Sequence, residues 1–282
     1  HVLTIKGDGT PESLFDGVAI LSSSWWSANQ AREALKIEWD MGAVSGFSTE
    51  GYAAQAAERL KGKADGDIVR AGDVDAAFAG AAKTVSAQYD YPFLAHGTLE
   101  PQNCTALFKD GAIEIWAPTQ NPESGRGLVA KALNLPPEKI RINFTRIGGG
   151  FGRRLMNDYM VQAAAIAAQL PGVPVKLLYN RQQDIQRDFY RPAGWHGFRA
   201  ALDKGRKMTA FHDHFVTFGK DGKPVRSAEM PATEIPAGLI DTVLLEQSFL
   251  ATNMPTGWLR APGSNAVSYT HLRAHETRGN IV

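Results

Sequence analysis

Residues 140–170 read IRINFTRIGGGFGRRLMNDYMVQAAAIAAQL and contain the pattern on which the fold depends. Residues 140–147 alternate in polarity as a strand does, and residues 156–170 place apolar side chains at helical spacing. Between these segments the chain spells GGGFG at 148–152. Because glycine lets the backbone pass close to a ligand, successive N–H groups of such a loop can surround an anion. The stretch therefore predicts a strand, a ligand-binding loop and a helix, in that order.

The glycine run does not match the common nucleotide-binding motifs. With Gly148 and Gly150 as the first pair of a dinucleotide fingerprint, the third glycine position holds Arg153. The Gly-Lys-Ser/Thr ending of a P-loop is also missing. Two interpretations stay open on these residues alone: a loop for a phosphate-bearing or otherwise anionic cofactor, and a tight structural turn. Arg153 and Arg154 favour the first one.

The composition argues against several classes of function. The 282 residues carry 30 basic and 29 acidic side chains, so no electrostatic argument favours nucleic acid or an anionic membrane as partner. Cys104 is the single cysteine and cannot build a disulfide framework, a tetrathiolate zinc site or an iron–sulfur cluster within this chain. No apolar run approaches the roughly 20 residues of a membrane span. The compartment stays open between periplasm and cytoplasm.

Patterns along the chain predict a mixed α/β protein. Residues 1–42 contain a small strand–helix–strand unit, and the Gly- and Ala-rich residues 43–67 are interpreted as a linker with one helical stretch. Residues 68–265 form the second predicted domain. The predicted strands are 17–23, 36–40, 84–93, 103–118 (a hairpin turning at 109–111), 140–147, 173–180 and 208–218, and the predicted helices are 25–35, 52–61, 74–81, 121–134 and 156–170.

Both ends of the chain depart from an ordinary domain sequence. The chain opens at His1 on a strand that is already under way, so we expect a segment before it. Residues 266–277 spell AVSYTHLRAHET, which resembles one reading frame of a transposon-type sequencing adapter, and residues 266–282 are therefore interpreted as an artefactual tail. A genuine polar tail is the alternative. The two histidines of this segment are accordingly not taken as a metal site, and a poorly packed end is expected.

Three longer segments carry a resemblance to a known family. They are AGDVDAAFAGAAKTVSAQYDYPFLAHGTLEPQNCTA at 71–106, APTQNPESGRGLVAKALNLPPEKIRINFTRIGGGFGRR at 117–154 and ATNMPTGWLRAPGSN at 251–265. Their order and spacing resemble the molybdopterin-binding large subunit of the xanthine dehydrogenase/aldehyde oxidase family. The arginine pair after GGGFG, with RQQDIQRDFYRP at 181–192, is most similar to the isoquinoline 1-oxidoreductase beta-subunit group. The resemblance implies an α+β fold, with 1–42 as the C-terminal part of an a/b hammerhead domain and 68–265 as the first part of the molybdopterin-binding domain.

The resemblance also implies a cofactor: a molybdenum held by the dithiolene of a pterin, as molybdopterin or its cytosine dinucleotide. The protein supplies no direct metal ligand in such a site, so hydrogen bonds around the cofactor carry its recognition. Gln120 would offer its amide to cofactor oxygens, and Phe151 would form a wall beside the substrate. Arg260 would contact phosphate or pterin groups. The residues implied in cofactor binding are Gln120, Gly149, Gly150, Phe151, Gly152, Arg153 and Arg260.

The implied activity is the oxidation of an aldehyde or the hydroxylation of an N-heterocycle with oxygen from water, and electrons would leave to a separate 2Fe–2S subunit. The family's general base is a glutamate near the end of a much longer chain, and no residue here corresponds to it. No catalytic residue is therefore assigned, and the 282-residue chain alone is expected to be inactive. Leu94 and Leu155 stand where purine-hydroxylating members carry a glutamine and a glutamate, which disfavours purine oxidation. A non-catalytic module that binds an anion or phosphate is the alternative.

Several reactive residue types also have structural interpretations. His96 and Glu100 are either groups near a cofactor oxygen or a hydrogen-bonded structural pair, and neither is assigned to the site. His212 and His214 share a strand face and are expected to be solvated, because no third metal ligand lies nearby in sequence. Cys104 is expected in a core.

Aromatic and charged groups away from the glycine run are likewise assigned to structure. Trp25 and Trp26 open a predicted helix and are expected to cover a core rather than touch substrate. A salt-bridged surface is preferred over a partner contact for the charged residues Asp184, Arg187, Asp188 and Arg191.

Overall fold

The computed structural model describes residues 1–38, 46–233 and 238–260. The chain folds into two compact units, each built from two separate stretches. His1–Asp40 and His96–Phe189 form the first unit, and Met41–Ala95 and Tyr190–Val282 form the second. The family-level domain boundaries, with a hammerhead part at 1–42, stay a prediction.

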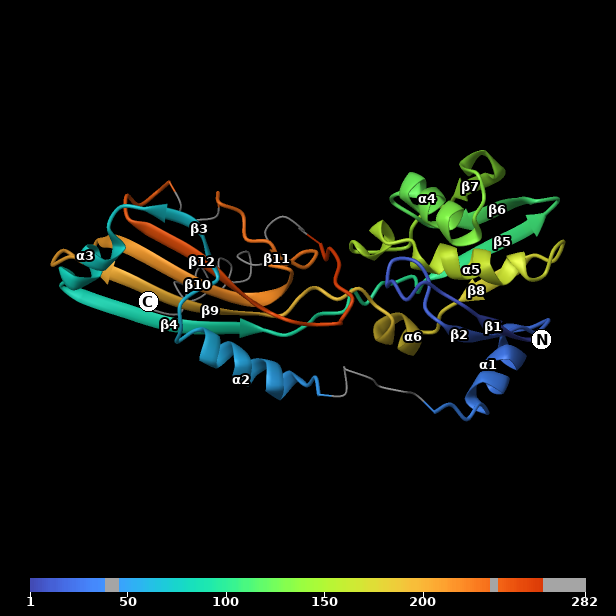
Figure 1. Ribbon diagram of the computed structural model, residues 1–282, viewed down its shortest axis with the longest axis horizontal. Helices are drawn as coiled ribbons and strands as arrows, with labels where there is room; N and C mark the ends of the chain where they lie inside the picture. Colours follow the sequence, from blue (N-terminus) through green and yellow to red (C-terminus); the bar gives the residue numbers. More distant parts are fainter. Residues whose placement is uncertain (39–45, 234–237, 261–282) are drawn as a thin grey trace. The chain divides into compact units, whose positions relative to one another are not determined.

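A four-stranded sheet in the order β7-β6-β5-β8 lies at the centre of the first unit (Figure 1). The hairpin of β5 and β6 turns at Asp110 and Gly111, whose φ angles of 52° and 73° suit a type I′ turn. β6 and β7 run parallel with α4 between them, and β8 pairs antiparallel with β5. The bounds are β5 Asn103–Lys109, β6 Ala112–Ala117, α4 Pro122–Leu133, β7 Ile140–Phe144 and β8 Val175–Leu178, with a short 3-10 helix at Pro137–Lys139.

The core of the first unit lies between this sheet and α5, Asp158–Ala168. Small side chains at Ala163, Ala164 and Ala167 are completely buried and let the helix pack closely on β5 and β8. Cys104 on β5 is 1% exposed, which confirms its prediction as a core residue. Burial of apolar surface stabilises the folded state by roughly 25 cal/mol per Å². Because side chains of β6 and β7 belong to this core, the core fixes the strand ends from which the two loops continue.

The N-terminal stretch adds a two-stranded antiparallel sheet, β1 Val2–Ile5 with β2 Gly17–Ile20, and helix α1 Trp25–Glu33. Two expectations for it are wrong. Residues 36–38 form no strand, and residues 39–40 lie outside the described residues. Trp25 and Trp26 are 42% and 66% exposed, because α1 contributes no buried residue to a core.

The second unit is a mixed sheet in the order β3-β12-β10-β9-β4, with β11 paired to β10 (Figure 1). On one face, Tyr52 and Ala56 of α2 pack against Phe218 and Leu250. Tyr91, Phe215 and Leu245 belong to a separate core cluster. The bounds are α2 Thr49–Arg59, β3 Gly66–Ala71, α3 Val74–Ala79, β4 Lys83–Tyr91, β9 Gly194–Leu202, β10 Met208–Lys220, β11 Lys223–Pro224 and β12 Val243–Leu250.

The mixture of helices and strands confirms the predicted α+β class. Sequence patterns missed the strands β3, β9, β11 and β12 and the short helix at Arg181–Gln186. β12 is buried along most of its length and pairs in parallel with β10, so its side chains do not alternate between polar and apolar. Within the described residues, no helix has the length and apolarity that crossing a membrane requires. The predictions for the tail at 266–282 fall outside the described residues.

Candidate functional site

Two loops come together where the parallel strands β6 and β7 end. Gln120 lies on the loop after β6, and the glycine run, Gly148–Gly152, lies on the loop after β7. The backbone N–H of Gln120 donates to the carbonyl of Arg154 at 3.0 Å, so the structure brings Gln120 beside the glycine run. The carboxyl ends of parallel strands commonly form ligand sites in this way. Arg260 belongs to the second unit, where it is exposed.

The glycine run requires glycine for two physical reasons. Gly149 and Gly152 have φ angles of 84° and 109°, in the left-handed region that favours glycine. Gly150 instead lies against a side chain, since a Cβ there would come 2.6 Å from Cγ of Arg154. Phe151 also has a positive φ, 51°, which is unusual for a bulky residue. Backbone strain of this kind clusters at ligand-binding sites.

Four consecutive backbone donors of the run have no acceptor within the described part of the chain: the N–H groups of residues 149–152. The preceding N–H, that of Gly148, donates to Oε2 of Glu100 at 2.7 Å. Backbone N–H groups are nearly always paired with protein, water or a ligand. A row of such donors on a glycine loop is suited to bind oxygens of an anionic group.

Arg153, directly after the run, is completely buried and engaged by carboxylates. Two of its nitrogens donate to both oxygens of Asp158 at 2.7 and 2.9 Å, and its Nε lies 3.0 Å from Oδ1 of Asp188. Burial alone would lower the pKa of this guanidinium, but the charges of Asp158 and Asp188 outweigh burial and raise the pKa above its usual range. This geometry anchors the end of the run. The assignment of Arg153 to cofactor binding stays a prediction.

For Asp184 and Asp188 the predicted ion pairs are present, with Arg181 at 3.2 Å and Arg153 at 3.0 Å, but the predicted surface location is wrong, because both aspartates are 2% exposed. Asp184, on α6 (Arg181–Gln186), accepts hydrogen bonds from the Thr98 hydroxyl at 2.8 Å and the Gln102 N–H at 3.0 Å. Asp188 faces Arg153. Sequence spacing could not reveal the contacts to Thr98, Gln102 and Arg153, because these residues lie more than 30 positions away in the chain.

Arg154 supports the glycine run from within the protein. Its side chain is completely buried, and Nη2 donates to the carbonyls of Glu100 and Pro101 at 3.0 Å each. Its guanidinium lies over the ring of Tyr159, 5.1 Å from the centroid. Burial raises the pKa of the Tyr159 hydroxyl to about 12, and this hydroxyl donates to Pro118 at 2.8 Å. Arg154 therefore ties the glycine run to the segment around Glu100.

His96 and Glu100 have separate partners rather than each other. Nδ1 of His96 lies 2.9 Å from Oδ1 of Asp188, whereas Glu100 accepts from Gly148. The alternative of a mutual structural pair is therefore wrong. Glu100 is the contact to the glycine run that the sequence patterns do not assign to the site. The 48 positions between Glu100 and Gly148 gave no local signal for this contact.

The expectation that His212 and His214 are solvated is wrong. His214 is 3% exposed, and its Nε2 lies 2.8 Å from the Ser248 hydroxyl. His212 is partly buried, with Nε2 2.7 Å from Glu246. Both partners lie on β12, the parallel neighbour of β10. No group of three or more metal-ligating side chains is present among the described residues.

Acidification is expected to weaken the second unit through His214. Burial lowers the pKa of its imidazole below the ordinary 6.5, although the nearby Glu246 charge opposes this effect. Below about pH 6.5 the unfolded chain therefore binds a proton that the folded chain does not, and the free energy of unfolding falls by at most about 1.4 kcal/mol per pH unit until the folded-state pKa is reached. Urea unfolding of wild type and His214→Gln at about pH 7.5 and about pH 5.5 measures this contribution. An equal pH dependence in both proteins contradicts it.

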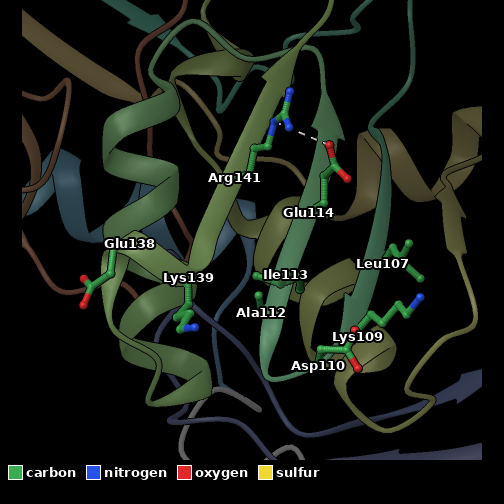
Figure 2. Close-up of a pocket in the computed structure, with 9 residues that line it drawn as sticks. All are labelled: Leu107, Lys109, Asp110, Ala112, Ile113, Glu114, Glu138, Lys139 and Arg141. Atoms are coloured by element: carbon green, nitrogen blue, oxygen red, sulfur yellow. Dashed lines mark ion pairs between the residues drawn. The ribbon is translucent and has the colours of Figure 1, made fainter.

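A shallow surface pocket lies near the start of β6 and β7, away from the strand ends that lead to the glycine run (Figure 2). Glu114 on β6 and Arg141 on β7 point toward one another there, with Oε1 and Nε 3.5 Å apart. Three basic and three acidic side chains line the pocket, so it has no preference for a ligand of either charge: Lys109, Asp110, Glu114, Glu138, Lys139 and Arg141. We assign it no role.

The family described as the molybdopterin cofactor-binding domain matches residues 60–271. A membrane-bound aldehyde dehydrogenase [pyrroloquinoline-quinone] of Gluconacetobacter polyoxogenes is 31% identical over 268 residues, which cover 89% of this chain and 35% of that protein. The isoquinoline 1-oxidoreductase subunit beta of Brevundimonas diminuta is 29% identical over 214 residues, or 70% of this chain and 26% of that protein.

Solved structures show the same fold. Quinoline 2-oxidoreductase from Pseudomonas putida 86 superposes with a TM-score of 0.67 over 99% of this chain and 39% of that chain, at 20% sequence identity. The chain thus spans well under half the length of the relatives it matches.

Proposed function

This chain belongs to the molybdopterin cofactor-binding family of the xanthine dehydrogenase type, and we propose that it forms part of the cofactor site of a molybdenum-dependent oxidoreductase. The observation that carries the proposal is the row of N–H groups at 149–152 without an acceptor among the described residues. Oxygens of a molybdopterin cofactor are acceptors that fit such donors. A Cβ at Gly150 would come 2.6 Å from Cγ of the buried Arg154, so a side chain there would displace the loop that carries these donors.

The chain's own residues would hold and orient the cofactor rather than react. When bound, the cofactor supplies a redox centre that accepts two electrons from the substrate. The N–H groups of Gly149–Gly152 would donate to its oxygens, and the neighbouring Gln120 would offer a further amide. Arg153 and Arg260 complete the proposed set. Since two carboxylates already surround Arg153, we expect its contribution to be the position of the loop.

The proposed substrate is an aldehyde or an aromatic N-heterocycle. Exposed apolar side chains lie against and within the glycine run: Leu99, which is 74% exposed, approaches Gly149, and Phe151 is 37% exposed. Such surfaces favour an uncharged apolar substrate over a carboxylate. The names of the two relatives, an aldehyde dehydrogenase and an isoquinoline oxidoreductase, agree with this class.

The proposed partner is a separate subunit that carries 2Fe–2S clusters. Cys104 is the single cysteine of this sequence, and burial raises the pKa of its thiol to about 12, which keeps it protonated and unsuited to bind iron. The Brevundimonas relative is itself named as a beta subunit. Electrons from the substrate would therefore leave to a cluster outside these 282 residues, which we propose lies on such a separate subunit.

Elemental analysis of the full-length gene product tests the proposal. The protein is co-expressed with its candidate small subunit and purified, and molybdenum is expected in stoichiometric amount. The name of the Gluconacetobacter relative includes pyrroloquinoline quinone, so the absorption spectrum is recorded as well. Folded protein without molybdenum, or with a quinone spectrum instead, would overturn the proposal. Retention of phosphate without molybdenum would favour the alternative, a non-catalytic anion-binding module.

A further inference from the structure

Glu100 lies on the segment before β5 and contacts the glycine run through both its side chain and its backbone. Its Oε2 accepts the N–H of Gly148 at 2.7 Å, and its Oε1 accepts from Nδ2 of Asn103 at 2.9 Å. Its backbone N–H donates to the carbonyl of Gly148 at 3.0 Å, and the N–H of Leu99 donates to the carbonyl of Gly149 at 3.0 Å. The short segment 99–100 thus binds both polar groups of Gly148 and the carbonyl of the next residue.

These contacts determine where the free donors of the run point. In a trans peptide the N–H points opposite to the C=O of the same peptide plane. Because the carbonyls of Gly148 and Gly149 both face segment 99–100, the N–H groups of Gly149 and Gly150 both face away from it. Two successive N–H groups on one side form the kind of concavity that binds anions. The positive φ of Gly149, 84°, makes this arrangement possible.

The Glu100 side chain is itself held in place. Arg154 donates to the carbonyls of Glu100 and Pro101, and its Nη2 lies 3.7 Å from Oε2 of Glu100. A Cβ on Gly148 would lie 2.9 Å from Cβ of Glu100, which shows how closely the two segments approach. The carboxylate therefore acts from a fixed position on a loop whose glycines would otherwise allow many conformations.

We propose that Glu100 is a positioning residue, whose carboxylate holds Gly148 so that the N–H groups of Gly149 and Gly150 are aimed at the bound cofactor. The inference rests on the proposed function. It gives Glu100 no contact with substrate or cofactor. Its contribution is to restrict the loop before the cofactor binds, and residues that orient binding groups commonly change affinity by roughly 10- to 100-fold.

Three substitutions in the full-length gene product separate the possible roles of Glu100. Glu100→Ala removes the acceptor, Glu100→Gln keeps an acceptor oxygen at the same reach without the charge, and Glu100→Asp keeps the charge at a shorter reach. Glu114→Ala is the matched control. Glu114 is 35% exposed against 31% for Glu100, and it accepts from Asn143 at 2.9 Å. It also forms an ion pair with Arg141 (Figure 2).

Two measurements are made on each variant: molybdenum per chain by elemental analysis, and hydrogen exchange of the N–H groups at 148–152 in cofactor-free protein. In Glu100→Ala, the molybdenum content per chain is expected to fall roughly 10-fold, and the hydrogen of the Gly148 N–H is expected to exchange roughly 10-fold faster than in wild type. Glu100→Asp should follow it, whereas Glu100→Gln and Glu114→Ala should match wild type in both measurements.

The outcomes distinguish this inference from the proposed function. Wild-type protein without molybdenum overturns the proposed function, while the exchange measurement still tests the loop. If wild type holds molybdenum and Glu100→Ala holds as much with unchanged exchange, Glu100 has no positioning role. Should Glu100→Ala fail to fold, the variants Glu100→Asp and Glu100→Gln decide the question. If Glu100→Asp retains molybdenum and Glu100→Gln loses it, the inference is overturned, because the charge of the side chain rather than its reach would then be required.

Discussion

Replacing Arg153 with methionine is expected to lower the free energy of unfolding of the first unit by about 3–5 kcal/mol, the cost of leaving buried charges unpaired. Asp158 and Asp188 would each lose their guanidinium partner, and their side chains are 6% and 1% exposed. His96 would still face Asp188, but Asp158 would keep no charged partner among the described residues. Urea unfolding followed by circular dichroism measures the loss.

A matched arginine provides the control for this substitution. Arg126 on α4 forms an exposed ion pair with Glu123 at 3.3 Å, and the two side chains are 39% and 78% exposed. Arg126→Met should therefore cost less than about 1 kcal/mol. Combining Arg153→Met with Asp158→Asn should recover part of the loss, because one unpaired charge is removed. If Arg153→Met lowers the free energy of unfolding no more than Arg126→Met does, the buried ion pairs make no net contribution to stability.

Replacing Gly150 with alanine is expected to abolish most cofactor loading in the full-length protein. The new Cβ would lie 2.6 Å from Cγ of Arg154 and 3.3 Å from Cγ2 of Ile147. Arg154 has no room to yield, because it is completely buried and bonded to two carbonyls. The loop must shift instead, and overpacking of this kind costs about 1–3 kcal/mol. Molybdenum content should fall by roughly 10-fold or more, as measured by elemental analysis.

Gly127 on α4 offers the corresponding control. A Cβ at this exposed position meets nothing within 4 Å, so Gly127→Ala should load molybdenum as wild type does and gain up to about 1 kcal/mol from helix propensity. Equal molybdenum content in the Gly150 and Gly127 variants would show that the run tolerates a side chain. The proposed binding by backbone N–H groups would then be wrong.

Local patterns predicted the elements that build the site. The alternation at 140–147, the glycine run and the apolar spacing at 156–170 correspond to β7, the loop and α5. The hairpin at Asp110 and Gly111 was also predictable, since this residue pair favours the positive φ angles of its turn. Each of these features depends on residues close together in the chain, so the sequence contains the required information.

Long-range contacts were not predictable in the same way. The buried positions of Arg153 and Arg154 contradict the usual exposure of arginine, and each depends on partners from distant segments. β12 was missed because burial removes the polar alternation by which strands are recognised. The role of Trp25 and Trp26 was predicted wrongly, because an amphipathic pattern does not say whether a core lies beside the helix.

By itself, the sequence determined the mixed fold class, the family and the glycine loop, because these follow from short-range spacing and from motifs. Only the tertiary structure decided which groups of that loop can bind a ligand. Folding places Glu100 and Arg154 against the run and encloses Arg153 between two aspartates. The guanidinium of Arg153 and Nη2 of Arg154 are thereby engaged within the protein, whereas Nε and Nη1 of Arg154 and the N–H groups of 149–152 have no acceptor in the described chain.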